Sequence, residues 1–163
     1  MSEVTIRPAR EDELGTVGEL TINAYHADGF ETSGEYALKL ADARPRAGQA
    51  ELLVAVDDTD TVLGTVTVAP PGSPWAQVSA SDELEFRMLA VAPAARGRGV
   101  GEALTRRVIE RAEELGLRAV TLSSSPNMVV AHRLYERLGF RRTPEADWSP
   151  VPGVDLITYR LDL

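Results

Sequence analysis

Residues 89–101 read L-A-V-A-P-A-A-R-G-R-G-V-G, and the rest of the predicted fold is organised around this segment. Its first residues are typical of the end of a strand, Pro93 interrupts the chain, and a glycine-rich turn then opens a helix. Gly97, Gly99 and Gly101 remove every second Cβ, so backbone N–H groups can approach an anion closely. The unpaired first-turn N–H groups and the positive dipole end of the helix add to this attraction. The stretch therefore predicts a site for a phosphate or pyrophosphate.

Two common phosphate-binding loops do not fit this turn. A P-loop needs Lys and then Ser or Thr after its last glycine, whereas Glu102 follows Gly101 here. The dinucleotide fingerprint G-x-G-x-x-G needs a third glycine, and the two candidate positions hold Glu102 and Leu104. Arg96 and Arg98 add mobile positive charge beside the turn. What remains is R-x-x-G-x-G directly after a strand, or a turn that merely links strand to helix.

The size and composition of the chain limit the classes of protein to which it can belong. A length of 163 residues suits one domain over residues 1–163, with a core that needs no covalent staples. The absence of cysteine excludes disulfides, thiolate metal sites and cysteine nucleophiles, and two distant histidines make a metal site unexpected. The N-terminal residues do not resemble a signal peptide, and no apolar run approaches about 18 residues. We therefore expect a soluble, cytoplasmic protein with no membrane partner.

The net charge of −8 is unevenly distributed along the chain. Residues 96–142 hold ten of the 17 basic residues and only five acids, which leaves the rest of the chain strongly acidic. An acidic chain argues against a nucleic-acid partner. The basic part suits an anionic cofactor and the acidic part a cationic acceptor, although solvated helix faces explain much of the same pattern.

Hydrophobic periodicity, caps and turn residues predict an alternation of strands and helices with no linker or internal repeat. Strands are expected at 4–7, 51–56, 61–69, 83–91, 119–122, 140–143 and 155–161, and helices at 11–25, 32–43, 99–115 and 127–138. Thr32 to Glu35 fit a capping box, and loops are expected at 44–48 and 70–82. The order predicts a mixed α/β sandwich with one parallel strand pair around the glycine turn.

Two motifs together resemble those of the GCN5-related N-acetyltransferase (GNAT) superfamily. R-x-x-G-x-G at 96–101 is similar to its acetyl-CoA signature, and N-M-V-V-A-H-R-L-Y-E-R-L-G-F at 127–140 is similar to its later motif N-x-x-A-x-x-L-Y-x-x-x-G-F. The opening I-R-P-A at 6–9 extends the resemblance over essentially the whole chain. It implies the GNAT acyl-CoA N-acyltransferase fold, a central mixed, mostly antiparallel sheet flanked by about four helices.

The resemblance also implies where acetyl-CoA binds. The cofactor-binding positions are Leu89, Ala90, Val91, Arg96, Gly97, Arg98, Gly99, Val100, Gly101, Asn127 and Ala131. The first three would hold pantetheine and the thioester through their backbone, and ordinary sheet packing is compatible with this role. The chain departs from the family pattern because Asn127 lies four residues before Ala131 rather than three, with Met128 in its usual place. Asn127 could instead cap a helix.

Four arginines near the second motif are candidates for the ribose 3′-phosphate of CoA, although surface charges are usually just solvated. They are Arg133, Arg137, Arg141 and Arg142.

In this superfamily an acetyl group passes from acetyl-CoA to an amine, which must be neutral to attack. A lysine-like amine with a pKa of about 10.4 needs roughly 4 kcal/mol to lose its proton near neutral pH. Glu85, six residues before Val91, matches the family position of a general base, with Glu83 as the fallback. Strand alternation would place Glu85 on one face with Arg87, Leu89 and Val91. A salt bridge to Arg87, or a polar rim position, is an equally good interpretation of Glu85.

Tyr135 of the second motif matches the tyrosine that often protonates the leaving thiolate in this superfamily; packing on the sheet is the alternative. Tyr25, His26, Phe30 and Trp75 are candidates for the acceptor pocket, or for the core. A CoA-binding sensor without turnover and a generic phosphate-binding module are the competing functions. The acceptor and the oligomeric state stay open, although homodimers are common in the superfamily.

Overall fold

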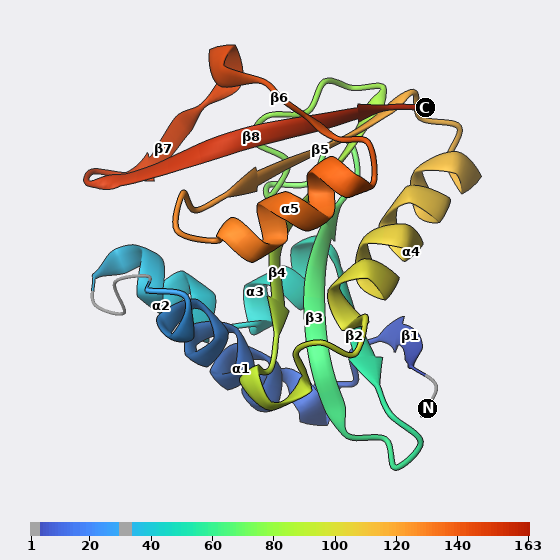
Figure 1. Ribbon diagram of the computed structural model, residues 1–163, viewed down its shortest axis with the longest axis vertical. Coiled ribbons are helices and arrows are strands. Elements are labelled where there is room, and N and C mark those ends of the chain that lie inside the picture. Colours follow the sequence, from blue (N-terminus) through green and yellow to red (C-terminus); the bar gives the residue numbers. More distant parts are fainter. Residues whose placement is uncertain (1–3, 30–33) are drawn as a thin grey trace.

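A mixed sheet runs through the computed structural model, which describes residues 4–29 and 34–163 (Figure 1). Its strands are β1 (Thr5–Pro8), β2 (Glu51–Val56), β3 (Val62–Ala69), β4 (Glu83–Val91), β5 (Ala119–Ser124), β6 (Arg141–Arg142), β7 (Trp148–Val151) and β8 (Val154–Asp162). They lie in the order β1-β2-β3-β4-β5-β8-β6, and β7 pairs with β8. Only β4 and β5 pair in parallel within the described sheet, as the sequence predicts around the glycine turn.

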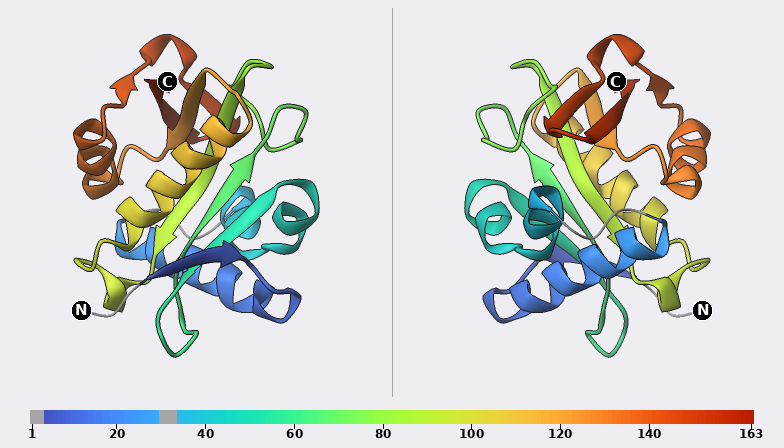
Figure 2. Two further views of the ribbon diagram at one scale, coloured as in Figure 1. Left: turned by 90° about the vertical axis from the view of Figure 1, so that its right-hand side faces the viewer. Right: turned by 90° about the vertical axis from the view of Figure 1, so that its left-hand side faces the viewer.

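Helices cover both faces of this sheet. They are α1 (Leu14–Ala27), α2 (Glu35–Ala41), α3 (Arg44–Gln49), α4 (Val100–Glu114) and α5 (Val129–Arg137), with short 3₁₀ turns at Glu11–Glu13, Pro93–Ala95 and Pro144–Ala146. Figure 2 shows α4 on one side of the sheet and α1, α2 and α3 on the other. The predicted fold class is confirmed. Within the described ranges, no helix is long and apolar enough to cross a membrane.

The structure corrects the predicted loop at 44–48, which is helix α3. Pro45 lies in the first turn, where its missing N–H costs nothing. Arg46 is fully buried and donates to carbonyl groups at the end of α2, which ties the two helices together. The short strand β7 was not predicted, because it contains Pro150 and pairs only with β8. Thr32 and Ser33 of the predicted capping box lie outside the described residues, and α2 begins after Gly34.

The two central strands separate at their carboxyl ends. Parallel pairing joins Glu83–Phe86 to Ala119–Leu122 and goes no further along β4 or β5. Just beyond this point Met88 has a φ of 55°, and the register of β4 against β3 shifts. The edge of β4 that faces β5 therefore carries backbone groups outside the sheet ladder from Arg87 onward. The candidate site lies at this separation of β4 and β5.

The shift at Met88 also corrects the expected alternation of β4. Leu84, Phe86 and Leu89 belong to the core beneath α4 and α5, whereas Met88 and Ala90 pack with α1 and α2. Glu85 and Arg87 therefore face away from Leu89 and Val91 rather than sharing a face with them. An extra residue in one strand exchanges the two faces for everything that follows it.

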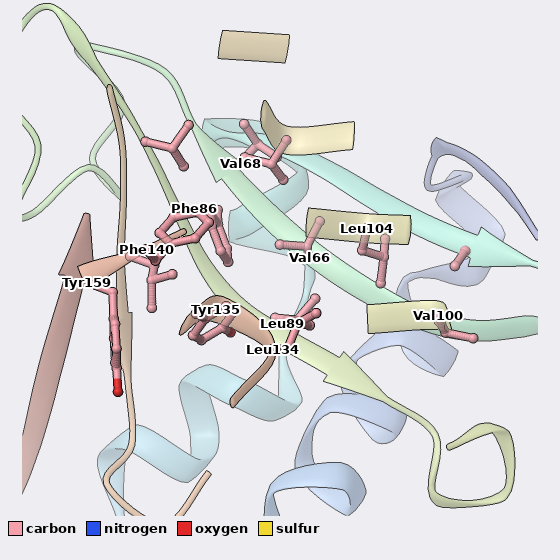
Figure 3. Close-up of a cluster of buried hydrophobic side chains, with 14 of the residues drawn as sticks. Val66, Val68, Phe86, Leu89, Val100, Leu104, Leu134, Tyr135, Phe140 and Tyr159 are labelled. Atoms are coloured by element: carbon pink, nitrogen blue, oxygen red, sulfur yellow. The ribbon is translucent and has the colours of Figure 1, made fainter. Parts of the chain in front are cut away.

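The core beneath α4 and α5 fixes the position of α4 relative to the sheet. Figure 3 shows Leu104 of α4 beside Val66 of β3, with Val100 and Val68 on opposite sides of this pair, and all four side chains are almost fully buried. Each buried aliphatic side chain of this size stabilises the fold by roughly 1.5–3 kcal/mol. Because the first turn of α4 is part of this core, the helix N-terminus is held rigidly beside β4.

Candidate active site

The glycine turn leads into the N-terminus of α4, and no side chain among the described residues caps this helix. Gly97 and Gly99 have φ values of 80° and 75°, in the left-handed region that a side chain disfavours. Gly99 is the N-cap residue, and the first helical bond runs from the N–H of Ala103 to its carbonyl at 3.0 Å. The N–H groups of the first turn are then left without helical acceptors. This is a backbone surface suited to an anion.

The helix start opens onto a cleft of about 260 Å³ at the separation of β4 and β5. Its walls come from β4, the glycine turn, α5 and the end of α1. They are formed by Ala24, Asp28, Leu89, Val91, Ala95, Arg96, Gly97, Gly99, Val100, Gly101, Glu102, Met128, Val130, Ala131, Leu134 and Arg137. The cleft is apolar towards β4 and α5 and polar at the glycine turn, which suits a ligand with an anionic end and a long uncharged arm.

Both arginines of the lining already hold carboxylates. Arg96 binds Asp28 at the end of α1 through contacts of 2.7 and 3.0 Å, and it also donates to the Ala24 carbonyl. Arg137 binds Glu102 in the first turn of α4 at 3.1 Å. An incoming phosphate would compete with these carboxylates for the guanidinium groups. The backbone N–H groups of the turn therefore supply the unopposed part of the attraction.

Arg98 is exposed and lies outside the lining formed by the described residues.

The shifted position of Asn127 in the second motif is matched by the position of its side chain in the structure. Met128 lines the cleft, whereas Asn127 points elsewhere and donates its side-chain amide to the Gly29 carbonyl at 3.2 Å. Helix α5 begins after Met128, with no side-chain cap, so the structure does not use Asn127 as the predicted cap. Ala131, one turn into α5, lines the cleft as expected from its small side chain.

The four arginines proposed for the 3′-phosphate are not gathered at one place. Arg137 lines the cleft. Arg142 is held by Asp147 through two contacts of 2.9 Å and lies over the ring of Tyr159. Arg133 and Arg141 are exposed, on α5 and β6.

Tyr135 lies directly behind the cleft wall. It follows Leu134 on α5, and its side chain is 3% exposed. Its ring contacts Phe86, Phe140 and Tyr159 at centroid distances of 5.8–5.9 Å (Figure 3). Burial raises the pKa of the Tyr135 hydroxyl well above its ordinary value, so the group keeps its proton at neutral pH. A protonated hydroxyl beside the cleft can act as an acid.

Glu85 is fully buried and anchors the loop between β3 and β4. Its Oε1 accepts hydrogen bonds from the backbone N–H groups of Gln77, Val78 and Ser79, at 2.7, 2.8 and 3.1 Å. Oε2 is buried and has no hydrogen-bond partner among the described residues. Burial raises the pKa of this carboxyl.

The structure also bears on the alternative interpretation of Glu85 and on the fallback base Glu83. The alternative interpretation of Glu85, a salt bridge to Arg87 or a polar rim position, is not borne out among the described residues. The carboxyl group is fully buried, and loop N–H groups bind its Oε1. Glu83, the fallback base, lies at the far end of β4. There it is bound by Arg160 and by the N–H of Ala80.

The proposed acceptor residues divide into two groups. Tyr25 is 5% exposed and packs in one cluster with Met88, and Trp75 is partly buried against that cluster. His26 is exposed in the last turn of α1. Phe30 lies outside the described residues.

Sequence reasoning missed three residues near this cluster: Arg46, Arg87 and Trp148. The basic residue in the middle of a strand whose other polar residues are acidic was a visible signal for Arg87. No such signal marked the other two. Among residues 4–29 and 34–163, no group of three or more His, Asp or Glu side chains is placed to hold a metal ion.

Comparison with known proteins places this geometry in a family. The profile of the Acetyltransferase (GNAT) family matches residues 19–140. An uncharacterised N-acetyltransferase of Schizosaccharomyces pombe is 34% identical over 112 residues, which cover 69% of this chain and 63% of the relative. N-acetylaspartate synthetase of Danio rerio is 42% identical over 71 residues, which cover 44% of this chain and 25% of the relative. The chain thus spans less than two thirds of the length of either relative.

The solved structures agree with this assignment. A GCN5-related N-acetyltransferase from Kribbella flavida has a TM-score of 0.70 and is 27% identical, with 98% of both chains covered. The family profile covers most of the chain, and both motifs line the cleft or lie directly behind it. The chain belongs to the GNAT family of acetyltransferases.

Proposed function

We propose that this chain transfers an acetyl group from acetyl-CoA to a primary amine by direct attack within a ternary complex. The acceptor would be a small amine, an amino acid or a peptide amine. Family membership supports the reaction class, and the acceptor is the finer part of the proposal. The observation that carries the proposal is the uncapped start of α4, which opens onto the cleft where β4 leaves β5.

The cleft offers separate contacts for the parts of acetyl-CoA. The N–H groups from Gly97 to Gly101 would hold the pyrophosphate, with Arg96 exchanging Asp28 for a phosphate oxygen. The free edge of β4 at Leu89, Ala90 and Val91 would bind the amide groups of pantetheine as an added strand does. An N–H at this edge would also polarise the thioester carbonyl.

Two buried groups are suited to the proton transfers of this reaction. Glu85 would accept the proton of the amine at its unpartnered Oε2. The proton would reach this oxygen directly from the substrate amine or through a water molecule between them. Tyr135 would give a proton to the leaving thiolate. Positioned proton transfer typically contributes about 10²–10⁴ in rate, and alignment of two bound reactants can supply roughly 7–11 kcal/mol of the barrier.

Thiol release from acetyl-CoA tests this proposal. The protein is mixed with acetyl-CoA and with a panel of amines, amino acids and short peptides, and free CoA thiol is followed with a chromogenic disulfide. We expect release that depends on the acceptor and saturates with it. Binding of acetyl-CoA without release for any member of a broad panel would favour the alternative, a CoA-binding sensor with the same fold. The single domain over residues 1–163, the cytoplasmic location and homodimer formation stay predictions.

A further inference from the structure

Arg87 on β4 is a buried cation that forms no salt bridge with a carboxylate of residues 4–29 or 34–163. It is 5% exposed, its Nε has no hydrogen-bond partner in the described structure, and its NH1 makes a long hydrogen bond of 3.5 Å to the Trp75 carbonyl. The guanidinium carbon lies 5.4 Å from the ring centroid of Trp75 and 5.2 Å from that of Trp148. Buried arginines are normally paired. Arg87 therefore has bonding capacity that the protein does not use.

Hydrogen bonds hold the two rings over which Arg87 lies. The indole N–H of Trp75 donates to Gln49 Oε1 at 3.0 Å, and that of Trp148 donates to Ser123 Oγ at 2.8 Å. Both tryptophans are partly exposed, in contrast to the arginine that they contact. A guanidinium fixed by aromatic faces keeps the edge of its planar fork for a bidentate partner. The arrangement is that of a preorganised anion site.

A second buried cation strengthens the positive potential. Arg46 is fully buried, and its NH1 donates to the carbonyls of Lys39, Leu40 and Asp42 at the end of α2. Burial, with a smaller contribution from the nearby charge of Arg87, lowers the pKa of Arg46 to about 10. The buried carboxylate of Glu85 interacts electrostatically with Arg87, but it is already bound to three loop N–H groups. The nearby carboxylate of Asp42, which acts on Arg46, is held by Arg44.

This positive region adjoins the inner end of the acetyl-CoA cleft. Arg87 lies two residues before the lining residue Leu89 on β4, with the irregular residue Met88 between them. Tyr25 joins the two places. It packs with Met128, which lines the cleft, and its hydroxyl is within electrostatic reach of both Arg87 and Tyr135. An acceptor that presents its amine at the thioester would extend towards Arg87.

We propose that Arg87 binds a carboxylate of the acceptor, which makes the acceptor an amino acid or a peptide with a free carboxylate close to the reacting amine. The inference rests on the proposed function and names its substrate class. The carboxylate would form a bidentate pair with the guanidinium edge and neutralise the excess charge of Arg46 and Arg87. The amine would then point along β4 towards the cleft.

Tryptophan fluorescence tests the inference without turnover, because the only two tryptophans of the chain are the two rings at Arg87. The CoA-loaded protein is titrated with the Nα-acetyl derivatives of alanine, glutamate and lysine and with their C-terminal amides. We expect at least one acid to change the emission saturably. Its amide should bind about 10- to 100-fold more weakly, the usual effect of losing a charge-assisted hydrogen bond.

Three variants assign that preference to Arg87. R87Q should remove the distinction between acid and amide, and R87K, which keeps the charge but not the fork, should keep part of it. The matched control is R107Q, which removes an arginine bound to Glu114 on the outer surface of α4 and should leave the preference unchanged.

The outcomes separate this inference from the proposed function. Equal binding of acids and amides by the wild type, no saturable change with any acid, or a preference that survives in R87Q would each overturn the inference. Failure of the proposed function would give a different result: acetyl-CoA would not bind in calorimetry, or no amine would cause the release of thiol. Loss of the fluorescence response in R107Q as well as R87Q would also overturn the assignment to Arg87.

Discussion

Replacement of Glu85 by Gln separates the two roles that the structure gives this side chain. The carboxylate holds the loop between β3 and β4 through three N–H groups, and its second oxygen is buried without a partner. Glutamine keeps one carbonyl oxygen for the three donors but places an NH₂ group where the unpartnered oxygen was. The variant therefore weakens the anchor and removes the base in one step.

The expected loss of stability follows from these contacts. A buried donor without an acceptor costs about 1–3 kcal/mol, and hydrogen bonds to a neutral oxygen are roughly half as strong as those to a charged one. Relief of the buried charge offsets part of this. We expect a decrease of about 2 kcal/mol in the free energy of unfolding, which corresponds to roughly 4–8 °C in Tm. If Glu85 is the base, kcat should also fall by about 10²–10⁴.

The pH dependence distinguishes the base from the anchor. Because burial raises the pKa of Glu85, the acidic limb of kcat/KM should lie at higher pH than for an exposed glutamate, and E85Q should lack that limb. Stability follows the same group with a definite sign. Relative to E85Q, the wild type should be most stable below the pKa of the unfolded state, and the part of its advantage that comes from the raised pKa should be lost as pH rises through the folded pKa.

Thermal unfolding and steady-state kinetics at several pH values measure both effects. Glu110→Gln, on the exposed surface of α4, is the matched control and should change neither. An acidic limb that persists in E85Q would refute the role of base. An unchanged Tm would refute the anchoring argument.

Two further substitutions test the acid and the packing of the helices. Tyr135→Phe keeps the ring contacts in the core and removes the hydroxyl, so kcat should fall by about 10²–10⁴ while calorimetric affinity for acetyl-CoA stays the same; an unchanged kcat would exclude the general-acid role. Gly18→Ala would place a Cβ 1.9 Å from the last carbonyl oxygen of α2, and we expect a loss of about 3 kcal/mol or more in thermal or denaturant unfolding. Gly15→Ala on the same helix has open space and should stabilise by up to about 1 kcal/mol, so equal effects of the two changes would contradict the packing described.

Most of the fold could be predicted from local patterns in the sequence. The apolar stripe of α4, the glycines around it and the alternating strands each follow from short-range periodicity, and the structure has them within a few residues of the expected bounds. Helix α3 was missed because its stability comes from the buried side chain of Arg46, a long-range contact with the end of α2. A pattern of neighbours along the chain does not contain such a contact.

The cleft was easier to predict than the acceptor side. The polar end of the cleft is formed by the glycine turn and the start of α4, and both are visible in the sequence as a run of glycines before a helical pattern. The face of Glu85 was predicted wrongly, because the shift at Met88 depends on pairing with β3 rather than on local alternation. The cluster around Arg87 joins residues from β4, the loop at Trp75 and β7, and only the folded chain brings these together.

Calorimetric titration with acetyl-CoA, on the wild type and on Gly101→Val, tests the central claim most directly. A Cβ at Gly101 would lie 3.4 Å from Leu134 and 3.6 Å from Val91, so a valine side chain would enter the cleft between two of its walls. We expect one site on the wild type, clearly weaker binding of ADP, and loss of acetyl-CoA binding in the variant with its fold intact. Absence of binding to the wild type, or equal binding of ADP and acetyl-CoA, would contradict it.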